Sequence, residues 1–266
     1  MRQRRAVAAL AVVLVVASGC ERASGPEPPV LPDAMSALGD SITAASVPAF
    51  DKLSPWNPAL SWATGGEAVG GHFARLVRLH PPLEGRASNH AVPGARISSA
   101  PAQAEKAVAD GADYVTFLFG ANDVCTLTPV DRFEADLRRA LGVLARALPE
   151  SEVFVVSIPD LARVRELYAD DQRVRTIWDR TRICPPVLDS DATDEELAAS
   201  LARWEDFNRL LAEVCEEHAN CRHDRGAVAA RTFGREEVSP VDGFHPSVEG
   251  QRRLAEVTWE AWLGRS

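Results

Sequence analysis

The sequence contains very little lysine and an excess of negative charge. Only Lys52 and Lys106 are lysines, and 29 Lys and Arg against 38 Asp and Glu give a formal charge of −9 for 266 residues. Nucleic-acid phosphates are bound by clustered positive charge. This charge balance therefore argues against a nucleic-acid partner.

Two kinds of site motif are also absent. There is no Cys-x-x-Cys pair and no Cys/His spacing typical of zinc sites, so the sequence implies no metal, and nothing in it implies an organic cofactor. A Gly-x-Ser-x-Gly nucleophile elbow is missing as well, which leaves the ordinary α/β-hydrolase arrangement unsupported.

Long apolar runs are lacking except near the N-terminus. Residues 6–16 are apolar but too short to span a bilayer, and three arginines precede them, as in an export signal. The following Ala-Ser-Gly-Cys resembles the lipobox of bacterial lipoproteins, in which Cys20 would be lipidated. A conventional small-residue cleavage site is the alternative. Either way we expect an exported protein, as a cell-surface or periplasmic lipoprotein or a secreted one.

Three segments follow from this interpretation. Residues 1–19 are expected to be a signal peptide, and the proline-rich residues 20–32 a disordered tether. Residues 33–266 would then form one catalytic domain. If Cys20 is lipidated, the tether would connect that domain to a membrane.

Export also accounts for the cysteines. Besides Cys20, the even set Cys125, Cys184, Cys215 and Cys221 remains, which is typical of disulfides in an oxidising compartment. Three pairings are possible. The pair Cys215–Cys221 is favoured because these residues mark the two ends of one helical segment, and this pairing leaves Cys125–Cys184.

Apolar strands and amphipathic helices alternate along the chain. Short strands are expected at 34–38, 87–90, 113–120 and 152–160, and helices at 67–79, 101–109, 132–148, 195–217 and 248–263. This alternation indicates an α/β fold with a parallel sheet covered on both faces. Residues 169–193 are charged and irregular in pattern, and they could form a lid or a surface loop beside the site.

Glycine-containing stretches follow three of these strands, at the sheet edge where α/β folds bind ligands. They are Gly39-Asp40-Ser41, residues 91–94 and residues 120–123. Among six histidines, His245 differs because Asp242 lies three residues before it, where a carboxylate can orient an imidazole. His72 and His80 are interpreted as packing or surface residues. Asp40 is the rival for the orienting acid, but a role in the turn is favoured.

The order of these motifs resembles the SGNH, or GDSL-type, hydrolases. Their serine, oxyanion glycine, asparagine and Asp-x-x-His pair match Ser41, Gly94, Asn122, Asp242 and His245. The stretches "LSWATGG", "NHAVPGA", "GANDVC" and "FHPSVEG" further resemble the phospholipase B-like branch. The resemblance implies a flavodoxin-like, three-layer α/β/α domain around a central parallel sheet.

The same resemblance implies a serine ester hydrolase. Ser41 would be the nucleophile, His245 the base and Asp242 its orienting acid, with Ser41, Gly94 and Asn122 as the oxyanion hole. We expect Gly94 to be needed because a side chain would obstruct close backbone approach.

The expected substrate is an acyl ester, favoured to be a (lyso)phospholipid or another fatty-acyl lipid. A carbohydrate deacetylase or small-ester esterase is the alternative within the enzymes, and a non-catalytic lipoprotein scaffold is the alternative outside them. Phe50, Trp56 and Trp62 could line an acyl groove, although aromatic residues at this density are more often part of the core.

Overall fold

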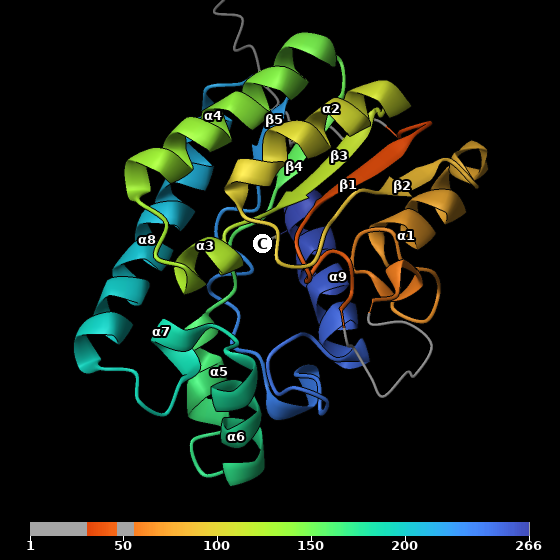
Figure 1. Ribbon diagram of the computed structural model, residues 1–266. Coiled ribbons are helices and arrows are strands. Elements are labelled where there is room, and N and C mark those ends of the chain that lie inside the picture. Colours follow the sequence, from red (N-terminus) through yellow and green to blue (C-terminus); the bar gives the residue numbers. More distant parts are fainter. Residues whose placement is uncertain (1–30, 47–55, 266) are drawn as a thin grey trace, which may run out of the picture.

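A computed structural model describes residues 31–46 and 56–265. The expected signal peptide, Cys20, nearly all of the tether and Phe50 lie outside these residues. No helix in the described ranges is both long enough and apolar enough to cross a membrane. The fold consists of a central sheet with helices on both faces (Figure 1).

The sheet has five strands, all parallel, in the order β2-β1-β3-β4-β5. The strands are β1 (Met35–Gly39), β2 (Ala87–Asn89), β3 (Tyr114–Leu118), β4 (Glu152–Val155) and β5 (Cys221–His223). Every residue of β1 and β3 is buried, as expected for central strands covered on both faces. Gly39 lies opposite Leu118, so the carboxyl ends of these two strands are level.

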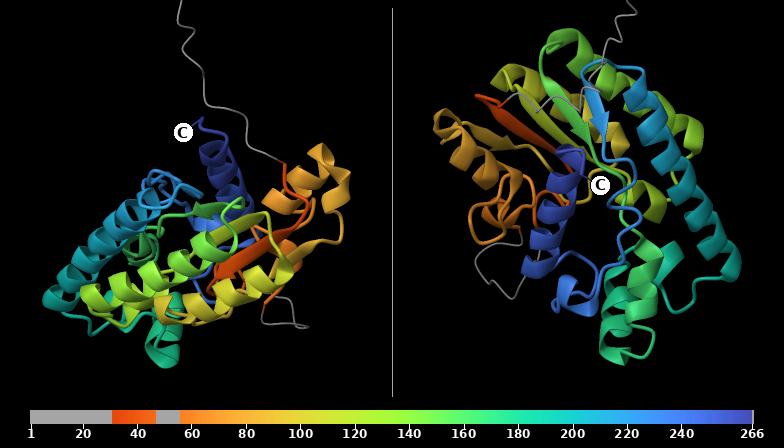
Figure 2. Two further views of the ribbon diagram at one scale, coloured as in Figure 1. Left: turned by 90° about the horizontal axis from the view of Figure 1, so that it is seen from above. Right: turned by 180° about the vertical axis from the view of Figure 1, so that it is seen from behind.

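Helices cover the two faces of the sheet separately, as the two views of Figure 2 show. One layer consists of α2 (Ala100–Asp110), α4 (Val130–Ala147) and α8 (Asp194–Glu216). The other consists of α1 (His72–Leu79) and α9 (Val248–Trp262). The shorter helices α3 (Ala121–Cys125), α5 (Leu161–Leu167), α6 (Gln172–Thr181) and α7 (Pro185–Leu188) lie beyond the carboxyl ends of the strands (Figure 1). The prediction of a three-layer α/β/α fold is confirmed.

His72 belongs to the core between α1, α9 and the sheet. Its Nδ1 lies 2.8 Å from the Tyr114 hydroxyl and its Nε2 lies 2.9 Å from Thr258 Oγ1. Burial lowers the pKa of His72 to about 3, so the ring is neutral at physiological pH. Its interpretation as a packing residue is confirmed, and it has no access to the cleft described below.

Residues 169–193 are not irregular, and this part of the prediction is wrong. Helix α6 begins after Asp171, whose side chain accepts a hydrogen bond from the Val174 N–H. Val174 and Trp178, four residues apart, point into the core. This spacing is the helical signal that the many charged residues around it obscured.

Two disulfides connect the described cysteines, and they are the pairs favoured from the sequence. Cys215–Cys221 joins the end of α8 to the start of β5, six residues apart. Cys125–Cys184 spans 59 residues and joins α3 to the start of α7. The second bond therefore holds the α6–α7 segment against the carboxyl edge of the sheet.

Candidate active site

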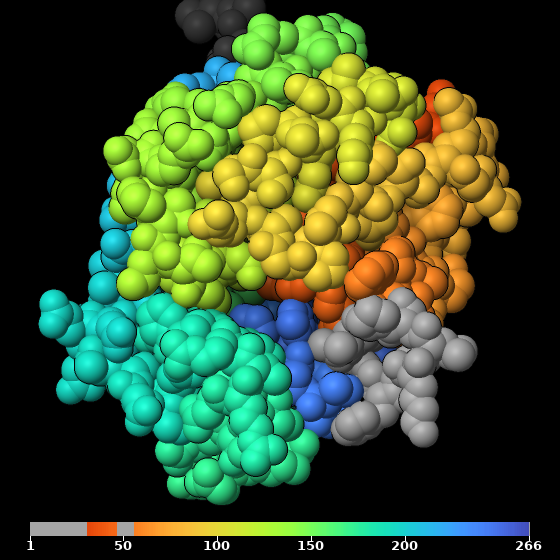
Figure 3. All heavy atoms as spheres, in the orientation of Figure 1, coloured from red at the N-terminus to blue at the C-terminus, as the bar shows by residue number. Residues whose placement is uncertain are grey.

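A cleft of about 470 Å³ opens at the carboxyl edge of the sheet, in the size range of small-molecule sites. Figure 3 shows it as a hollow between the yellow-green chain around α3, the teal α6–α7 segment and the red-orange and blue residues beside them. Its lining brings together all five residues singled out by the sequence: Ser41, Gly94, Asn122, Asp242 and His245. No group of three or more His, Cys, Asp or Glu side chains in the described ranges is arranged to hold a metal ion.

The turn that carries Ser41 packs tightly against its neighbours. A Cβ on Gly39 would lie 2.7 Å from the Leu118 carbonyl and 2.5 Å from Thr43 Oγ1, so only glycine fits at this position. Ser41 itself is 7% exposed. Close contact with β3 therefore fixes where the chain leaves the strand.

Two buried glutamines fix the same turn from opposite helical layers. The Gln103 amide of α2 accepts a hydrogen bond from the Gly39 N–H at 2.8 Å and donates to the Gly39 carbonyl at 2.9 Å. The Gln251 amide of α9 donates to the Ile42 carbonyl and accepts from the Trp62 N–H, both at 2.8 Å. The sequence analysis missed both residues, because an isolated glutamine in a helix has no sequence signature.

Asp40 stabilises the turn rather than orienting the histidine. Its Oδ1 accepts a hydrogen bond from the Ile42 N–H at 2.9 Å, which is the Asx-turn role favoured from the sequence. Complete burial raises the pKa of Asp40 to about 7, and the hydrogen bond from Ile42 only partly opposes this shift.

Asp242 and His245 form the hydrogen-bonded pair that the motif predicts. His245 Nδ1 lies 2.6 Å from Asp242 Oδ2. The other oxygen, Oδ1, accepts hydrogen bonds from the N–H groups of Phe244 and His245 at 2.9 and 3.1 Å. These bonds fix the carboxylate within its own loop, and Nδ1 faces the carboxylate as in a Ser-His-Asp triad.

The α6 helix packs against this loop. Trp178 Nε1 donates a hydrogen bond to the Asp242 carbonyl at 3.0 Å. Gly243 has a φ of +67°, and a Cβ there would lie 2.3 Å from Val174 Cγ1. The segment beside the site therefore shapes the loop of the acid and the histidine.

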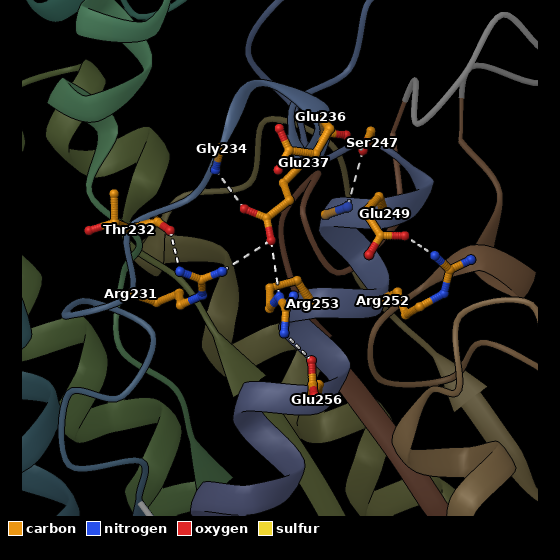
Figure 4. Close-up of polar contacts among 11 residues, drawn as sticks. Arg231, Thr232, Gly234, Glu236, Glu237, Ser247, Glu249, Arg252, Arg253 and Glu256 are labelled. Atoms are coloured by element: carbon orange, nitrogen blue, oxygen red, sulfur yellow. Dashed lines mark hydrogen bonds and ion pairs between the residues drawn. The ribbon is translucent and has the colours of Figure 1, made fainter.

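Glu237 anchors the same loop to α9 (Figure 4). This side chain, 4% exposed, accepts hydrogen bonds from the Gly234 N–H at 2.6 Å, from Arg253 Nε at 3.0 Å and from Arg231 at 3.3 Å. A buried carboxylate is stable when charged groups and N–H donors surround it in this way. The sequence gave no reason to single out Glu237.

Gly94 and Asn122 lie on the side of the cleft formed by the loops after β2 and β3. Asn122 Nδ2 donates to the Ala95 carbonyl at 3.0 Å, which fixes the amide plane next to the Gly94 loop. Gly94 has a φ of +78°, whereas a Cβ there would meet no atom within 4 Å. The positive φ is a reason for glycine that the sequence did not show, and the expected need for close backbone approach, which concerns a bound substrate, stays a prediction.

A second, apolar pocket of about 50 Å³ shares Phe244 and His245 with the cleft. Its walls come from Ile42, from α5, from the loop before His245 and from α9. The apolar side chains that line it are Ile42, Pro159, Leu161, Val164, Leu167, Phe233, Val238, Phe244, Pro246 and Leu254, and the charged residues among its lining are Asp160, Arg163 and Glu237. The site thus combines an open cleft, which holds the five motif residues, with a smaller and mostly apolar pocket beside His245.

The aromatic residues considered for an acyl groove have different positions. Trp62 is fully buried, and its Nε1 donates to Thr43 Oγ1 at 3.2 Å, so it is a core residue and not part of a groove. Trp56 lines the cleft and is 47% exposed.

Known proteins with similar sequences are phospholipases. The chain is 24% identical over 281 residues to the membrane-associated phospholipase B1 of Homo sapiens and 27% identical over 283 residues to that of Mus musculus. Each alignment covers 86% of this chain and 19% of the relative. The chain thus spans about one fifth of the length of the curated relatives it matches.

Solved structures share the fold. A protein from Parabacteroides merdae described as a GDSL-like lipase superposes with a TM-score of 0.57 at 20% identity, covering 91% of this chain and 100% of the other. An extracellular lipase from Streptomyces rimosus gives 0.52 at 19% identity, covering 85% and 98%.

A family model decides the membership. The model of the GDSL-like Lipase/Acylhydrolase family matches residues 37–253, which include the Ser41 turn, the loops of Gly94 and Asn122 and the Asp242–His245 pair. The resemblance noted in the sequence is thereby confirmed, and this chain belongs to the GDSL-like lipase/acylhydrolase family of ester-cleaving enzymes.

Proposed function

We propose that this protein hydrolyses carboxylic esters of lipids through a triad of Ser41, His245 and Asp242. The observation that carries the proposal is the 2.6 Å bond between His245 Nδ1 and Asp242 in the cleft that Ser41 also lines. With Nδ1 bonded to the carboxylate, Nε2 is the nitrogen that can take the proton from a serine hydroxyl.

The reaction proceeds in two halves. Ser41 Oγ attacks the ester carbonyl while His245 takes its proton, and the same proton then passes to the leaving alkoxide. Water releases the acyl group from Ser41 by the same route. The oxyanion of each tetrahedral intermediate is held by the N–H groups of Ser41 and Gly94 and by the Asn122 amide, whose plane the bond to Ala95 fixes beforehand.

The test compares two serines of the same cleft. Ser41 and Ser46 both line it and are 7% and 6% exposed. We expect Ser41→Ala to abolish hydrolysis of p-nitrophenyl butyrate and labelling by a fluorophosphonate, because the nucleophile is gone. Ser46→Ala should retain both. Activity of Ser41→Ala equal to that of Ser46→Ala would refute the proposal, and absence of labelling in the unmodified protein would favour a non-catalytic scaffold.

The acyl group is proposed to enter the apolar pocket next to His245. At roughly 10–15 Å³ for each water-sized group, its 50 Å³ hold about three to five carbon-sized groups. An acetyl group would leave most of this apolar wall without contact. Support for a (lyso)phospholipid or another fatty-acyl ester comes from this lining and from the similarity to proteins named phospholipase B1.

A panel of acyl chains separates this substrate from a carbohydrate or other small acetyl ester. Each buried methylene contributes about 0.8 kcal/mol, and a butyryl group has two methylenes more than an acetyl group. The kcat/KM for p-nitrophenyl butyrate should therefore exceed that for p-nitrophenyl acetate about tenfold. A preference for acetate would favour the deacetylase alternative. Hydrolysis of lysophosphatidylcholine then tests the phospholipid directly.

Export, with or without lipidation of Cys20, is part of the same proposal. The two disulfides support it, because such bonds persist in oxidising compartments. Metabolic labelling of the expressed full-length chain with a palmitate analogue distinguishes the alternatives: loss of label in Cys20→Ser supports lipidation, and an unlabelled parent protein indicates simple cleavage.

A further inference from the structure

We infer that the rim of the cleft is a docking surface for a phospholipid bilayer or micelle, so that the enzyme works at a lipid–water interface. This inference rests on the proposed ester hydrolysis and adds where the substrate is met. The docking rim is defined here as Trp56, Val92, Pro93, Arg182 and Ile183.

Exposed apolar side chains gather at this rim. In the described ranges only five large apolar side chains are strongly exposed, and two of them, Trp56 and Val92, are 47% and 48% exposed beside the cleft. Trp56 lines the cleft and pairs with Ser46, which is five residues after Ser41. The Val92 N–H donates to the Gly39 carbonyl at 3.1 Å, so Val92 lies where β1 ends.

The opposite wall of the cleft continues the apolar character. Ile183 and Pro185 line it there, and the bond between Cys184 and Cys125 holds this wall next to α3. Exposed apolar groups around a concave site mark surfaces that contact other molecules, and tryptophan is enriched at membrane–water interfaces.

The charges at the rim fit a phospholipid. Asp242 is the only carboxylate among the described residues that line the cleft, and it is bonded to His245, although the chain as a whole carries a charge of −9. Arg182 is the only arginine or lysine there. Its side chain pairs with Asp189 but is 68% exposed, which leaves guanidinium N–H groups for a lipid phosphate.

These features complement a lipid surface and not a soluble anionic partner. A strongly charged partner would require several cations at the rim, whereas apolar groups and one arginine match the acyl and phosphate layers of a bilayer. A chain that enters the surface in this way presents the cleft directly to the ester bonds below the headgroups.

The test measures sedimentation with vesicles of phosphatidylcholine containing phosphatidylglycerol. All proteins carry the full chain with Cys20→Ser, so that no acyl anchor contributes, and the N-terminal residues are the same in all of them, so that differences between variants report on the rim. We expect Val92→Ser to weaken partitioning about fivefold through lost apolar burial, and Arg182→Gln by a similar factor through the lost charge.

Leu79→Ser is the matched control. Leu79 is 58% exposed at the end of α1, and its neighbour His80 bonds Asp33 before the start of β1, at the opposite edge of the sheet. This variant should bind vesicles as the parent does. Equal binding by Val92→Ser and Leu79→Ser would overturn the inference, as would failure of the parent to sediment with vesicles.

The ester assay keeps this result separate from that of the proposed function. Val92→Ser should hydrolyse monomeric p-nitrophenyl acetate within about twofold of the parent, because the bond of Val92 to Gly39 is made by the backbone. Activity in Ser41→Ala refutes the triad and leaves the docking test intact. If Val92→Ser hydrolyses the ester normally and binds vesicles as well as Leu79→Ser does, the docking rim is refuted and the proposed triad is not.

Discussion

Removing the Cys125–Cys184 bond should cost far more than removing Cys215–Cys221. The two bonds close loops of about 60 and about 7 residues, because the cysteines are 59 and 6 positions apart. The chain-entropy relation gives about 4 kcal/mol for the longer loop and about 2 kcal/mol for the shorter one. Paired Cys→Ala variants, one pair for each bond, should therefore differ by about 2 kcal/mol in unfolding free energy.

The same variants should separate stability from activity. Asn122 lies three residues before Cys125 in α3, so loss of that bond releases both the asparagine and the opposite wall of the cleft. We expect kcat for p-nitrophenyl butyrate to fall at least about tenfold in the Cys125→Ala/Cys184→Ala variant, since small displacements of positioning groups are costly. The Cys215/Cys221 variant should keep its kcat.

Guanidinium unfolding followed by tryptophan fluorescence measures the first effect, and initial rates under native conditions measure the second. Equal losses of unfolding free energy in the two paired variants would refute the loop-length argument. An unchanged kcat without the Cys125–Cys184 bond would show that α3 is held by packing alone.

Two further predictions concern single residues of the site. Asn122→Ala should lower kcat by about 10²–10³ with little change in melting temperature, because one oxyanion donor is lost; a loss below tenfold in stopped-flow ester hydrolysis would argue against that role. Burial raises the pKa of Asp40 from the ordinary 3.8 of an aspartate to about 7, so the folded state holds a proton between these pH values that the unfolded state has lost. The stability that comes from the neutral carboxyl is therefore lost as the pH rises through 7. Between pH 4 and pH 8 the unfolding free energy of the parent should therefore fall by up to about 4 kcal/mol relative to that of Asp40→Asn, whose amide does not titrate. A difference between the two proteins that is independent of pH in denaturant titrations would contradict this.

The strands and motifs that place the site could be predicted because their signals are local. The β3 prediction at 113–120 contains the observed Tyr114–Leu118, and Ser41, Asn122 and His245 follow from short motifs next to strands or helices. By contrast, β5 (Cys221–His223) was missed. It is three residues long and only half-buried, so it has no apolar run, and its pairing with β4 depends on distant residues.

Helix boundaries depended on tertiary contacts in the same way. The helix expected at 67–79 begins only at His72. A Cβ on Gly71 would lie 2.6 Å from the Gly65 carbonyl, so two chain segments touch at this point and the helix starts after it. This close approach leaves no periodic trace in the sequence, and neither do the bonds of Gln251 to Trp62 and of Glu237 to Arg253, which are 189 and 16 positions apart.

The two glutamines at the Ser41 turn have a consequence for how the protein loses function. Gln103 belongs to one helical layer and Gln251 to the other, and each bonds backbone groups within two residues of Ser41. Displacement of either layer from the sheet therefore frees one side of this turn while the strands are still paired. Ester turnover should respond to partial unfolding of either face, which makes it a more sensitive measure of intact layering than the loss of secondary structure.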